Sequence, residues 1–463
     1  MLATPTCGAS VSVLDGATMG LAWTLPFVGI LLSIAMGPLL FPHVWHAYYG
    51  RIALFWALSM IVPLYMTNEV ATKTILVHTY IAEYIPFVSL VGALFVVASG
   101  LHIRIRGEGG PVINVTIMLV GSTFASFVGT TGAALLFIRP LIRMNAWRKY
   151  RSHTVIFFIF TVCNVGGALT ALGDPPLFLG FLNGVDFFWT TKHLWPPTVF
   201  MVFSLLFIYW VIDHRYHRKD VAALVPPHER RKSHDMVRFV EVEGKENFFY
   251  LGIILGAVIM SGYWDPGVNT VIFGVKLELQ NILRDIIIVT ASCFSYVRTP
   301  SNIHHKNQFR WEPLCEVAKL FAAIFITASP VFSMLKAEKA GAFSWLIDFA
   351  YTNGKPSTDA FFWLTGWLSS FLDNAPTYML FFHLAGGNAT TLMNEYANVL
   401  AAVSCGSVYM GAMTYIGNAP NFIVKSIAEE NHIHMPSFFG YLGWSSVILL
   451  PLFIFVDLII NWW

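Results

Sequence analysis

The sequence predicts an all-α polytopic membrane protein made of two related halves that are inverted relative to each other. Hydrophobic residues make up 56% of the 463 positions and charged residues only 12%, too few for the surface of a soluble protein of this length. Apolar stretches long enough to cross roughly 30 Å of hydrocarbon recur along the chain. A pattern of glycine and proline interruptions also occurs once in each half.

The apolar stretches give the expected membrane-spanning helices. The start of the chain lacks the basic region and small-residue cleavage site of a secretory signal, so its first apolar stretch is expected to be a retained span. The expected spans are 22–41, 52–66, 80–101, 154–172, 196–212, 248–263, 281–297, 314–335, 395–424 and 438–460.

A further apolar stretch, 112–138, is expected to enter and leave the membrane on one side. It lies between basic clusters at 104–106 and 139–151. Because basic residues mark the cytoplasmic side, both of its ends are expected in the cytoplasm, which predicts a re-entrant helical hairpin. The turn of this hairpin is expected at Gly121–Ser126 or Gly129–Gly132, and it must be buried in protein or line a cavity.

A second hairpin is expected at 360–386. The loop 213–247 holds the longest charged run of the chain and the loop 298–313 is also basic, so both are expected in the cytoplasm. Counting spans from there places 336–358 outside, so that 360–386 enters and leaves from the external face. The charged loop is interpreted as a solvated linker rather than a lipid-binding or regulatory segment.

The expected division of the chain follows from this order. Residues 1–111 supply the N-terminal spans, and 112–212 supply the first hairpin and first interrupted helix. The linker 213–247 is followed by further spans in 248–357. The second hairpin, the second interrupted helix and the last span occupy 358–463.

Corresponding motifs occupy the two hairpins and the helices that follow them. The first half carries SFVGTTGAALLFIRP and NVGGALTALGDPP, and the second carries SSFLDNAPTYMLFF and GAMTYIGNAPNFIV. Proline removes a backbone donor and glycine loosens a helix, so these elements are expected to be unwound near the membrane midplane. Single interruptions are often only kinks or packing sites, but four in a repeated order indicate a transport site.

Two aspartates, Asp174 and Asp373, lie within these breaks. A carboxylate in the membrane interior costs about 3 kcal/mol or more, so each is a candidate functional residue. Loss of water disfavours the ionised form and a bound cation favours it, so that a proton and Na⁺ can compete for one carboxylate. Either aspartate can instead cap a half-helix, and this alternative stays open for Asp174, which precedes two prolines. Asp373 is expected to be the principal cation ligand, with Asp174 as the second sodium ligand.

Neutral oxygen donors accompany the two carboxylates. Amide and hydroxyl oxygens suit a hard cation such as Na⁺, although any single Asn or Thr can equally serve an interhelical hydrogen bond. The expected set is Thr130, Thr131, Asn164, Thr170, Asn374, Thr377, Asn418 and Asn421.

Other classes of protein receive little support from the sequence. The net charge of +2 is too small to indicate nucleic-acid binding, and the five cysteines have no metal-like spacing. The expected spans contain no set of nucleophile and base, so an enzyme is not expected. No cofactor is expected. The expected partners are the lipid bilayer and a small ion, with Na⁺ and H⁺ as the transported species.

The order of these motifs resembles the ion transporter superfamily, which includes NhaD-type sodium/proton antiporters, arsenite permeases, citrate carriers and divalent-anion/sodium symporters. The resemblance covers nearly the whole chain. Asn164–Pro176 and Leu372–Thr377 are most similar to the antiporter and arsenite branches, and Gly417–Asn421 completes the pattern. The chain also resembles citrate transporter-like proteins.

This resemblance implies a rigid scaffold domain, largely 1–111 and 248–357, and a transport domain that holds both hairpins and moves as an elevator. It further implies a homodimer that is integral to the bacterial inner membrane.

Two departures from the family patterns bear on the substrate. The first hairpin carries Gly129-Thr130-Thr131 where antiporter relatives often show Asp-Asn-x-Thr-Thr, so only the second hairpin offers a carboxylate. The Ser-Asn-Thr signature of the dicarboxylate symporters is missing from both hairpins.

The first hypothesis is a sodium/proton antiporter in which Asp373, helped by Asp174, alternately binds Na⁺ and H⁺. The second is a cation-coupled symporter of an organic or inorganic anion such as citrate. For an anion, Arg139 is the one basic side chain expected near the site, and helix N-termini are the other donors.

Overall fold

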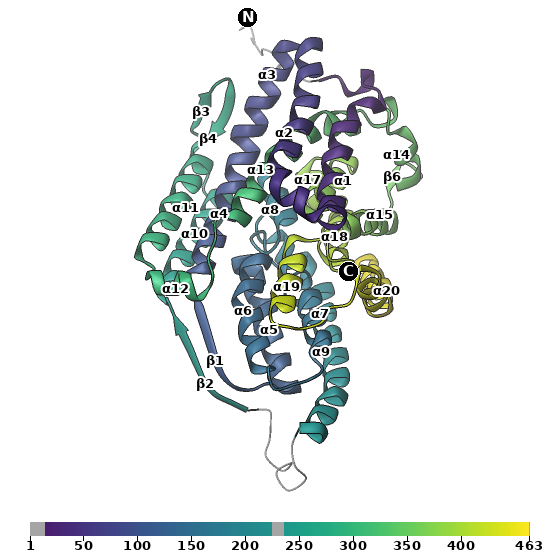
Figure 1. Ribbon diagram of the computed structural model, residues 1–463. Coiled ribbons are helices and arrows are strands. Elements are labelled where there is room, and N and C mark those ends of the chain that lie inside the picture. The colour runs from purple at the N-terminus through teal and green to yellow at the C-terminus, as the bar shows by residue number, and fades with distance from the viewer. Residues whose placement is uncertain (1–13, 225–235, 463) are drawn as a thin grey trace, which may run out of the picture.

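The computed structural model describes residues 14–224 and 236–462, and its regular structure is almost entirely helical (Figure 1). Eight helices in these ranges are long and apolar enough to cross a membrane. These helices confirm an all-α polytopic membrane protein. They are Leu21–Pro38, Pro42–Thr67, Glu69–Ser99, Pro111–Val128, Trp189–Ala223, Glu246–Tyr263, Glu312–Lys336 and Phe438–Trp462.

Within the described residues, the first half of the chain contains three long helical units, then a pair of helices, an interrupted segment and a further long helix. Its helices are α1 (Leu25–Leu40), α2 (Pro42–Thr67), α3 (Glu69–His78), a π-helical turn (Thr79–Tyr84), α4 (Ile85–Ser99), α5 (Pro111–Val128), α6 (Thr130–Met144), α7 (Ser152–Thr161), α8 (Pro175–Leu182) and α9 (Trp189–Leu224).

The second half repeats the order of a helix pair followed by an interrupted segment. Its helices are α10 (Glu246–Tyr263), α11 (Leu279–Arg298), α12 (Ser301–Lys306), α13 (Glu312–Lys336), α14 (Ser344–Ala350), α15 (Thr358–Phe371), α16 (Asn374–Leu384), α17 (Ala389–Asn394), α18 (Ala397–Met410), α19 (Ala419–Glu430) and α20 (Phe438–Trp462).

In the part of the chain that the structure describes, three short antiparallel ribbons connect these helices. The longest pairs β1 (His102–Glu108) with β2 (Met236–Glu243) and joins segments from the two halves of the chain. The other two are local hairpins. They pair β3 (Asn269–Ile272) with β4 (Val275–Glu278), and β5 (Tyr351–Thr352) with β6 (Lys355–Pro356).

Helices form at every predicted span. One of them, α11, is less apolar than predicted, and two of the predicted spans are interrupted, as the glycine and proline motifs predict. α11 covers the predicted span 281–297 but is not among the eight apolar helices, because residues such as Arg284 and Asp285 lower its hydropathy. In the predicted span 154–172, α7 ends at Thr161, and the next α-helix, α8, begins beyond the span at Pro175. The predicted span 395–424 is divided into α18 and α19. Glycine and proline account for both interruptions, because they weaken the helical hydrogen-bond ladder.

The segment expected as a solvated linker, 213–247, contains regular structure. α9 continues to Leu224, and β2 begins at Met236, while 225–235 lies outside the described residues. The helical continuation has a clear physical reason. Asp213 and Asp220 are both fully buried, so the start of this charged run is packed into the protein.

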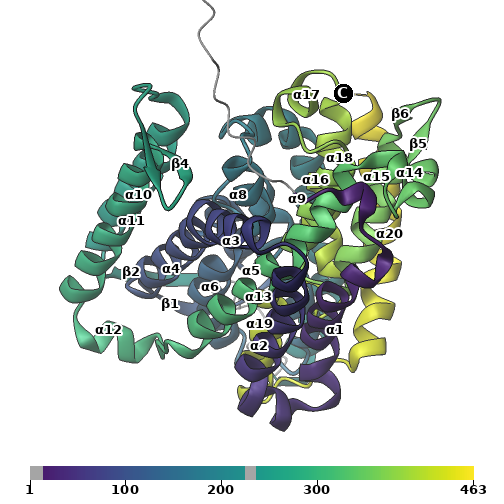
Figure 2. The same ribbon diagram turned by 90° about the horizontal axis from the view of Figure 1, so that it is seen from above.

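The helices pack around a centre made of the short and interrupted elements. In the view from above, α10 and α11 stand at one edge and α20 at the opposite edge, with α4, α6 and α13 between them (Figure 2). α5 packs on α6, α15 packs on α16 and α18, and α16 packs on α8. This packing brings both predicted hairpins and both interrupted segments into one core.

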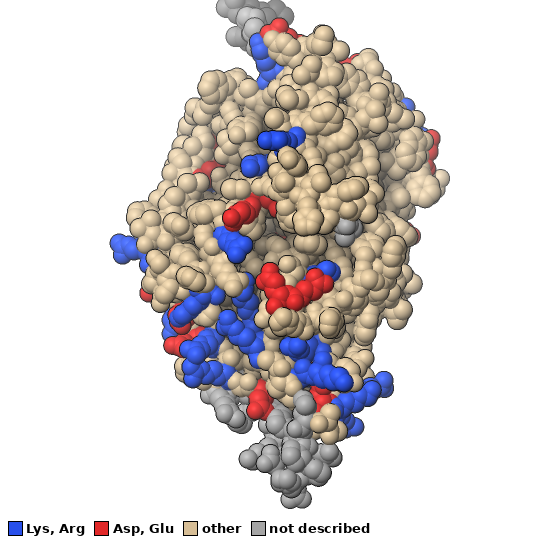
Figure 3. Space-filling view, in the orientation of Figure 1, with Lys and Arg blue, Asp and Glu red and all other residues tan. Residues whose placement is uncertain are grey.

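The surface of the molecule carries an apolar belt and a basic end. Large apolar side chains on outer helices are exposed, for example Phe207 of α9, Phe249 of α10 and Val447 of α20. Lys and Arg gather at the end of the molecule that holds β1, β2 and the end of α9 (Figures 1 and 3). This distribution is the one expected when the basic end faces the cytoplasm and the belt faces lipid.

Candidate functional site

Four breaks in the helices define the candidate site, and the first two lie inside the predicted hairpins. Gly129 separates α5 from α6 with a positive φ of 81°, a conformation that favours glycine. The predicted turn at Gly129–Gly132 therefore contains the break, whereas Gly121–Ser126 remains helical. Leu372 and Asp373 separate α15 from α16. α5 alone has the length of a span, so re-entry of 112–138 stays a prediction.

The other two breaks follow α7 and α18, and glycines allow the chain to double back there. A side chain on Gly173 would place its Cβ 2.0 Å from the carbonyl oxygen of Gly167. On Gly417 the Cβ would lie 2.6 Å from the carbonyl oxygen of Gly411. Only glycine permits backbone segments to approach this closely, which explains the glycine-rich motifs at both breaks.

Asp174 lies at the centre of the site. Its side chain is only 1% exposed and precedes α8 without making a capping hydrogen bond to that helix. One carboxylate oxygen accepts hydrogen bonds from Thr130 Oγ1 at 2.6 Å and from Asn418 Nδ2 at 3.4 Å. The other accepts one from Asn374 Nδ2. These donors come from α6, the α18–α19 break and α16, so the site joins both halves of the chain.

The partners of Asp174 are neutral, and one of them has an unused oxygen. Asn374 is fully buried, and its Oδ1 has no hydrogen-bond partner within the described structure. A buried polar oxygen without a donor is costly and requires an explanation, such as a bound ion. The site therefore combines a carboxylate with a free amide oxygen. Among residues 14–224 and 236–462, no group of three or more His, Cys, Asp and Glu residues could hold a metal ion.

Asp373 has a different environment from Asp174. It is partly exposed, and its side chain accepts a hydrogen bond from the backbone N–H of Ala375 at 3.1 Å, which caps α16. Thr377 Oγ1 donates to the carbonyl oxygen of Asp373 at 2.9 Å. The sequence left open that Asp174 caps a half-helix, but in the structure it is Asp373 that makes such a capping hydrogen bond. Its expected role as a cation ligand stays a prediction.

Three of the predicted asparagines bind one another and the broken backbone. Asn164 Nδ2 donates to Asn421 Oδ1 at 2.8 Å, and Asn418 Nδ2 donates to Asn164 Oδ1 at 3.2 Å. Asn421 Nδ2 in turn donates to the carbonyl oxygens of Gly411 and Thr414 at 2.8 and 3.0 Å. These amides hold the break after α7 against the break after α18.

The predicted threonines divide into two kinds. Thr170 Oγ1 donates to the carbonyl oxygen of Ser126 and accepts a hydrogen bond from Leu172 N at 3.1 Å, so it fastens the first break to α5. Thr130 and Thr131 instead line a cavity of about 80 Å³ beside Asp174. α4 and α13 form its opposite wall, and among the described residues Asp174 is the one charged residue in its lining. A cation in this cavity would therefore meet a single carboxylate.

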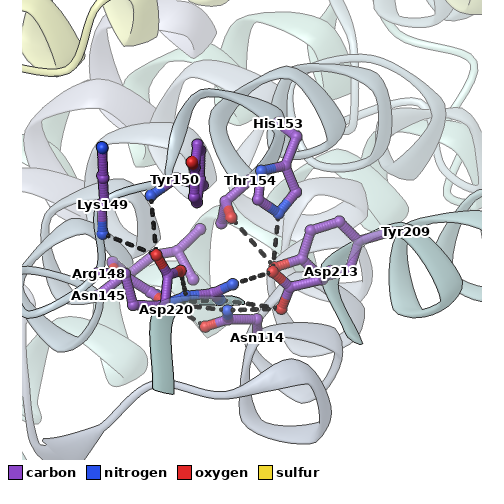
Figure 4. Close-up of polar contacts among 11 residues, drawn as sticks. Asn114, Asn145, Arg148, Lys149, Tyr150, His153, Thr154, Tyr209, Asp213 and Asp220 are labelled. Carbon is purple, nitrogen blue, oxygen red and sulfur yellow. Dashed lines mark hydrogen bonds and ion pairs between the residues drawn. The ribbon is translucent and has the colours of Figure 1, made fainter. Parts of the chain in front are cut away.

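A buried cluster of charges, which the sequence did not reveal, lies outside this site (Figure 4). The side chains of Arg148, Asp213 and Asp220 are all fully buried. Arg148 Nη2 lies 2.6 Å from Asp213 Oδ1, and its Nε donates to Asp220 Oδ2 at 3.1 Å. His153 Nε2 lies 2.7 Å from the same Asp213 oxygen. This cluster joins the segment after α6 and the start of α7 to α9.

The base of the first hairpin takes part in the same cluster. Asn114 of α5 and Asn145 after α6 exchange amide hydrogen bonds of 3.0 and 2.8 Å, and Asn114 also donates to Asp213 at 3.3 Å. In the sequence these charges look like ordinary cytoplasmic flanks. The seven-residue spacing of Asp213 and Asp220 places both on one helical face, and this spacing is the sequence feature that could have indicated the cluster.

Comparisons with known proteins bear on the identity of the chain. A sequence profile described as "Putative citrate transport" matches residues 16–461. The P protein of Sus scrofa is 27% identical over 121 residues, a match that covers 24% of this chain and 14% of the P protein. Because the profile covers nearly the whole chain, the chain belongs to the membrane-protein family described as "Putative citrate transport".

Proposed function

We propose that this protein is a secondary active transporter that exchanges Na⁺ for H⁺, with Asp174 as the residue that binds them in alternation. The observation that carries the proposal is the environment of Asp174. It is a fully buried carboxylate whose three side-chain donors, Thr130, Asn374 and Asn418, are all neutral. A buried charge without an ionic partner is strongly unfavourable, so this carboxylate requires either a proton or a cation.

The oxygen atoms near Asp174 suit Na⁺. Hard cations prefer carboxylate, amide and hydroxyl oxygens, and the unpartnered Oδ1 of Asn374 is such a ligand. When Asp174 is protonated, Asn374 Oδ1 has no binding partner. A sodium ion, in contrast, can bind both Asn374 Oδ1 and the Asp174 carboxylate. In this proposal Asp373, which caps α16 next to Asn374, is a second carboxylate outside the lining of the cavity.

Matching contacts at equivalent positions of the two halves support the repeat in this proposal. Thr170 donates to the carbonyl oxygen of Ser126, 44 residues earlier, and Thr414 donates to that of Ser370, also 44 residues earlier. The same shift of 244 residues that relates these two contacts also relates Asp174 to Asn418. Each half thus has one carboxylate at its breaks, but the two carboxylates are not at equivalent positions. Asp174 corresponds to Asn418, and Asp373 corresponds to Gly129.

The cavity beside Asp174 supports alternating access by movement of one body against another. Its walls come from α6 and α8 on one side and from α4 and α13 on the other. In the proposed mechanism, the hairpins and interrupted segments move together as the transport domain. The helices α2, α4, α10, α11 and α13 remain as the scaffold, and sliding at the cavity exposes Asp174 to each face in turn.

Cation-coupled transport of citrate or another anion is the second candidate. The description of the family favours it. The N-terminus of the 15-residue helix α6 also lines the cavity at Gly129, Thr130 and Thr131. The N–H of Thr130 donates to the carbonyl oxygen of Gly173, so the helix dipole is the feature that would attract an anion there. In this alternative, Asp174 binds the coupling cation and the anion binds beside it.

Reconstitution into proteoliposomes with a pH-sensitive dye inside tests the proposal. A sodium gradient is expected to drive proton movement without any organic anion, and Asp174→Asn is expected to abolish it. Asp265→Asn, which changes an exposed aspartate in the loop after α10, is the matched control. Sodium-driven proton movement that requires citrate would instead establish the second candidate. Full activity of Asp174→Asn would contradict both.

A further inference from the structure

A histidine is buried where the second hairpin meets α13, outside the lining of the Asp174 cavity. His383 lies in the last turn of α16 and is only 5% exposed. Its ring packs against Phe332 of α13, with 4.4 Å between the ring centroids. Because α16 belongs to the proposed transport domain and α13 to the proposed scaffold, this imidazole lies in the contact between the two bodies.

The imidazole of His383 is held by apolar contacts and not by hydrogen bonds at its buried nitrogen. Nδ1 has no hydrogen-bond partner among the described residues. The turn after α16 covers this atom, because Gly387 has a φ of 67° and a Cβ there would lie 2.6 Å from Nδ1. A phenylalanine would fill the same space without leaving a buried polar atom unpaired, so packing alone does not explain a histidine here.

The charge nearest in effect to His383 is positive. Lys336, one turn after Phe332 on α13, is the charged group of the described chain that acts on this ring. Lys336 also interacts electrostatically with His78 and Glu83, whose Nδ1 and Oε1 atoms lie 3.7 Å apart. A protonated His383 would therefore be a buried charge beside a second positive charge.

The other elements packed against α16 give the ring no carboxylate partner. α8 contains no titratable residue. Within residues 236–462, the titratable groups of α15, α18 and the segment after α13 do not act on His383. These groups include Asp359, Cys405, Tyr409, Tyr351 and Glu338. In this packing the neutral ring fits and the protonated ring does not.

We propose that His383 is a proton-sensitive latch between the second hairpin and the scaffold. The neutral ring seals α16 against α13, and protonation on the side predicted to face outside expels the ring and loosens the contact. The latch rests on the proposed function in one respect, since it regulates the movement of the two bodies. The response of the contact to pH does not itself depend on which ion is transported.

Cysteine labelling of the purified full-length protein in detergent tests the latch. The reporter is Ala328→Cys, which lies one turn before Phe332 on the same face of α13 and replaces a residue that is 1% exposed. An exposed reference, Thr352→Cys in the same protein, corrects for the effect of pH on thiol reactivity. Cys293 and Cys315 are replaced by serine, and maleimide labelling is read at each cysteine by mass spectrometry.

The ratio of reporter to reference labelling is expected to rise about thirtyfold when the pH falls from about 8 to about 5. An exposed imidazole has a pKa of about 6.5, so at the lower pH proton binding favours the open contact by that factor. His383→Phe keeps an aromatic ring and His383→Gln keeps a polar side chain, but neither titrates in this range. In both variants the ratio is expected to change by less than about twofold.

His78→Phe is the matched control, because His78 also interacts with Lys336 but is exposed. This variant is expected to keep the full response to acid. A response that persists in both His383→Phe and His383→Gln would overturn the latch, as would a wild-type ratio that ignores pH. An equal loss in His78→Phe would also overturn it. Melting temperatures close to that of the wild type are expected for all variants and show that they are folded.

Transport in proteoliposomes separates the latch from the proposed function. At saturating Na⁺, acid on the outer side is expected to raise the maximal rate in the wild type and not in His383→Phe. If sodium-driven proton movement is absent but the labelling ratio depends on His383, the antiport proposal fails alone. If antiport occurs as proposed but the labelling ratio does not depend on His383, the latch fails alone.

Discussion

The hydroxyl group of Thr130 holds one oxygen of the Asp174 carboxylate at 2.6 Å in a site that excludes most water. Hydrogen bonds to charged groups in such surroundings contribute about 1.5 to 3 kcal/mol. Thr130 belongs to the first turn of α6, so the break at Gly129 is what carries this hydroxyl group to the carboxylate. At the residue scale, the site depends on a few short polar contacts.

Thr130→Val is therefore expected to raise the KM for Na⁺ in proteoliposomes by about tenfold or more, through loss of that hydrogen bond. Thr130→Ser keeps the hydroxyl group and is expected to stay within a few-fold of wild type. Thr116→Val is a matched control, because Thr116 is exposed and bonds only within α5. A Thr130→Val protein with the wild-type KM would contradict the assigned contact.

Asp373 and Asp174 are expected to differ in their response to neutralisation. Asn caps helices about as well as Asp, so Asp373→Asn is expected to keep the cap of α16 and lose less transport than Asp174→Asn. Asp373→Ala removes the cap and is expected to reduce stability by about 1 kcal/mol. Sodium titrations of transport, together with unfolding curves, distinguish the two effects. Complete loss of transport in Asp373→Asn would show that this carboxylate is a required ligand.

At the element scale, the buried cluster around Arg148 fastens the first hairpin to α9 (Figure 4). The arginine contacts both Asp213 and Asp220, and Asn114 and Asn145 connect the two hairpin helices to the same place. The position of the hairpin base therefore depends on charges that lie far from the site at its tip. Removal of one partner would leave uncompensated buried charge.

Arg148→Met is expected to destabilise the protein by about 3 to 5 kcal/mol, because Asp213 and Asp220 then lack their cationic partner. Neutralising both acids in the same background, as Arg148→Met/Asp213→Asn/Asp220→Asn, is expected to restore part of that loss. Urea unfolding in detergent measures both. Arg104→Met, an exposed arginine of β1, is the control. Equal stability of the single and triple variants would contradict the charge-pair account.

At the scale of the whole molecule, the proposed movement takes place at the contact between the first hairpin and α4. A Cβ atom on Gly132 of α6 would lie 3.0 Å from the Cβ of Ala98 in α4. Disulfide-bonded cysteines have Cβ atoms about 3.5 to 4.5 Å apart, so a small adjustment would allow this pair to be bridged. The two positions belong to the bodies that the proposal assigns to transport domain and scaffold.

Oxidation of an Ala98→Cys/Gly132→Cys protein is expected to reduce transport at least tenfold, because the cross-link would hold the two bodies together. Reduction with dithiothreitol is expected to restore transport. The exposed native residues Cys293 and Cys315 are replaced by serine beforehand, and the two single cysteine variants serve as controls. Transport that survives a cross-link verified by mass spectrometry would rule out sliding at this contact.

The sequence by itself determined the membrane class, most of the helices and the places where they break. These features depend on local composition, because apolar length sets a span and glycine or proline sets an interruption. It also identified Asp174, Thr130, Asn374 and Asn418 as candidates, since polar groups are rare in such stretches. The β1–β2 pairing and the extension of α9 into the charged run depend on contacts between distant segments.

Only the tertiary structure decided how the candidates are used. It places Asp174 among donors from both halves and gives Asp373 a capping bond, although the two residues look alike in the sequence. It also shows Arg148, Asp213 and Asp220 as one buried cluster rather than separate loop charges. The physical reason is that burial and hydrogen-bond partners are properties of the packed chain, whereas sequence pattern reports only the residues available to fill those positions.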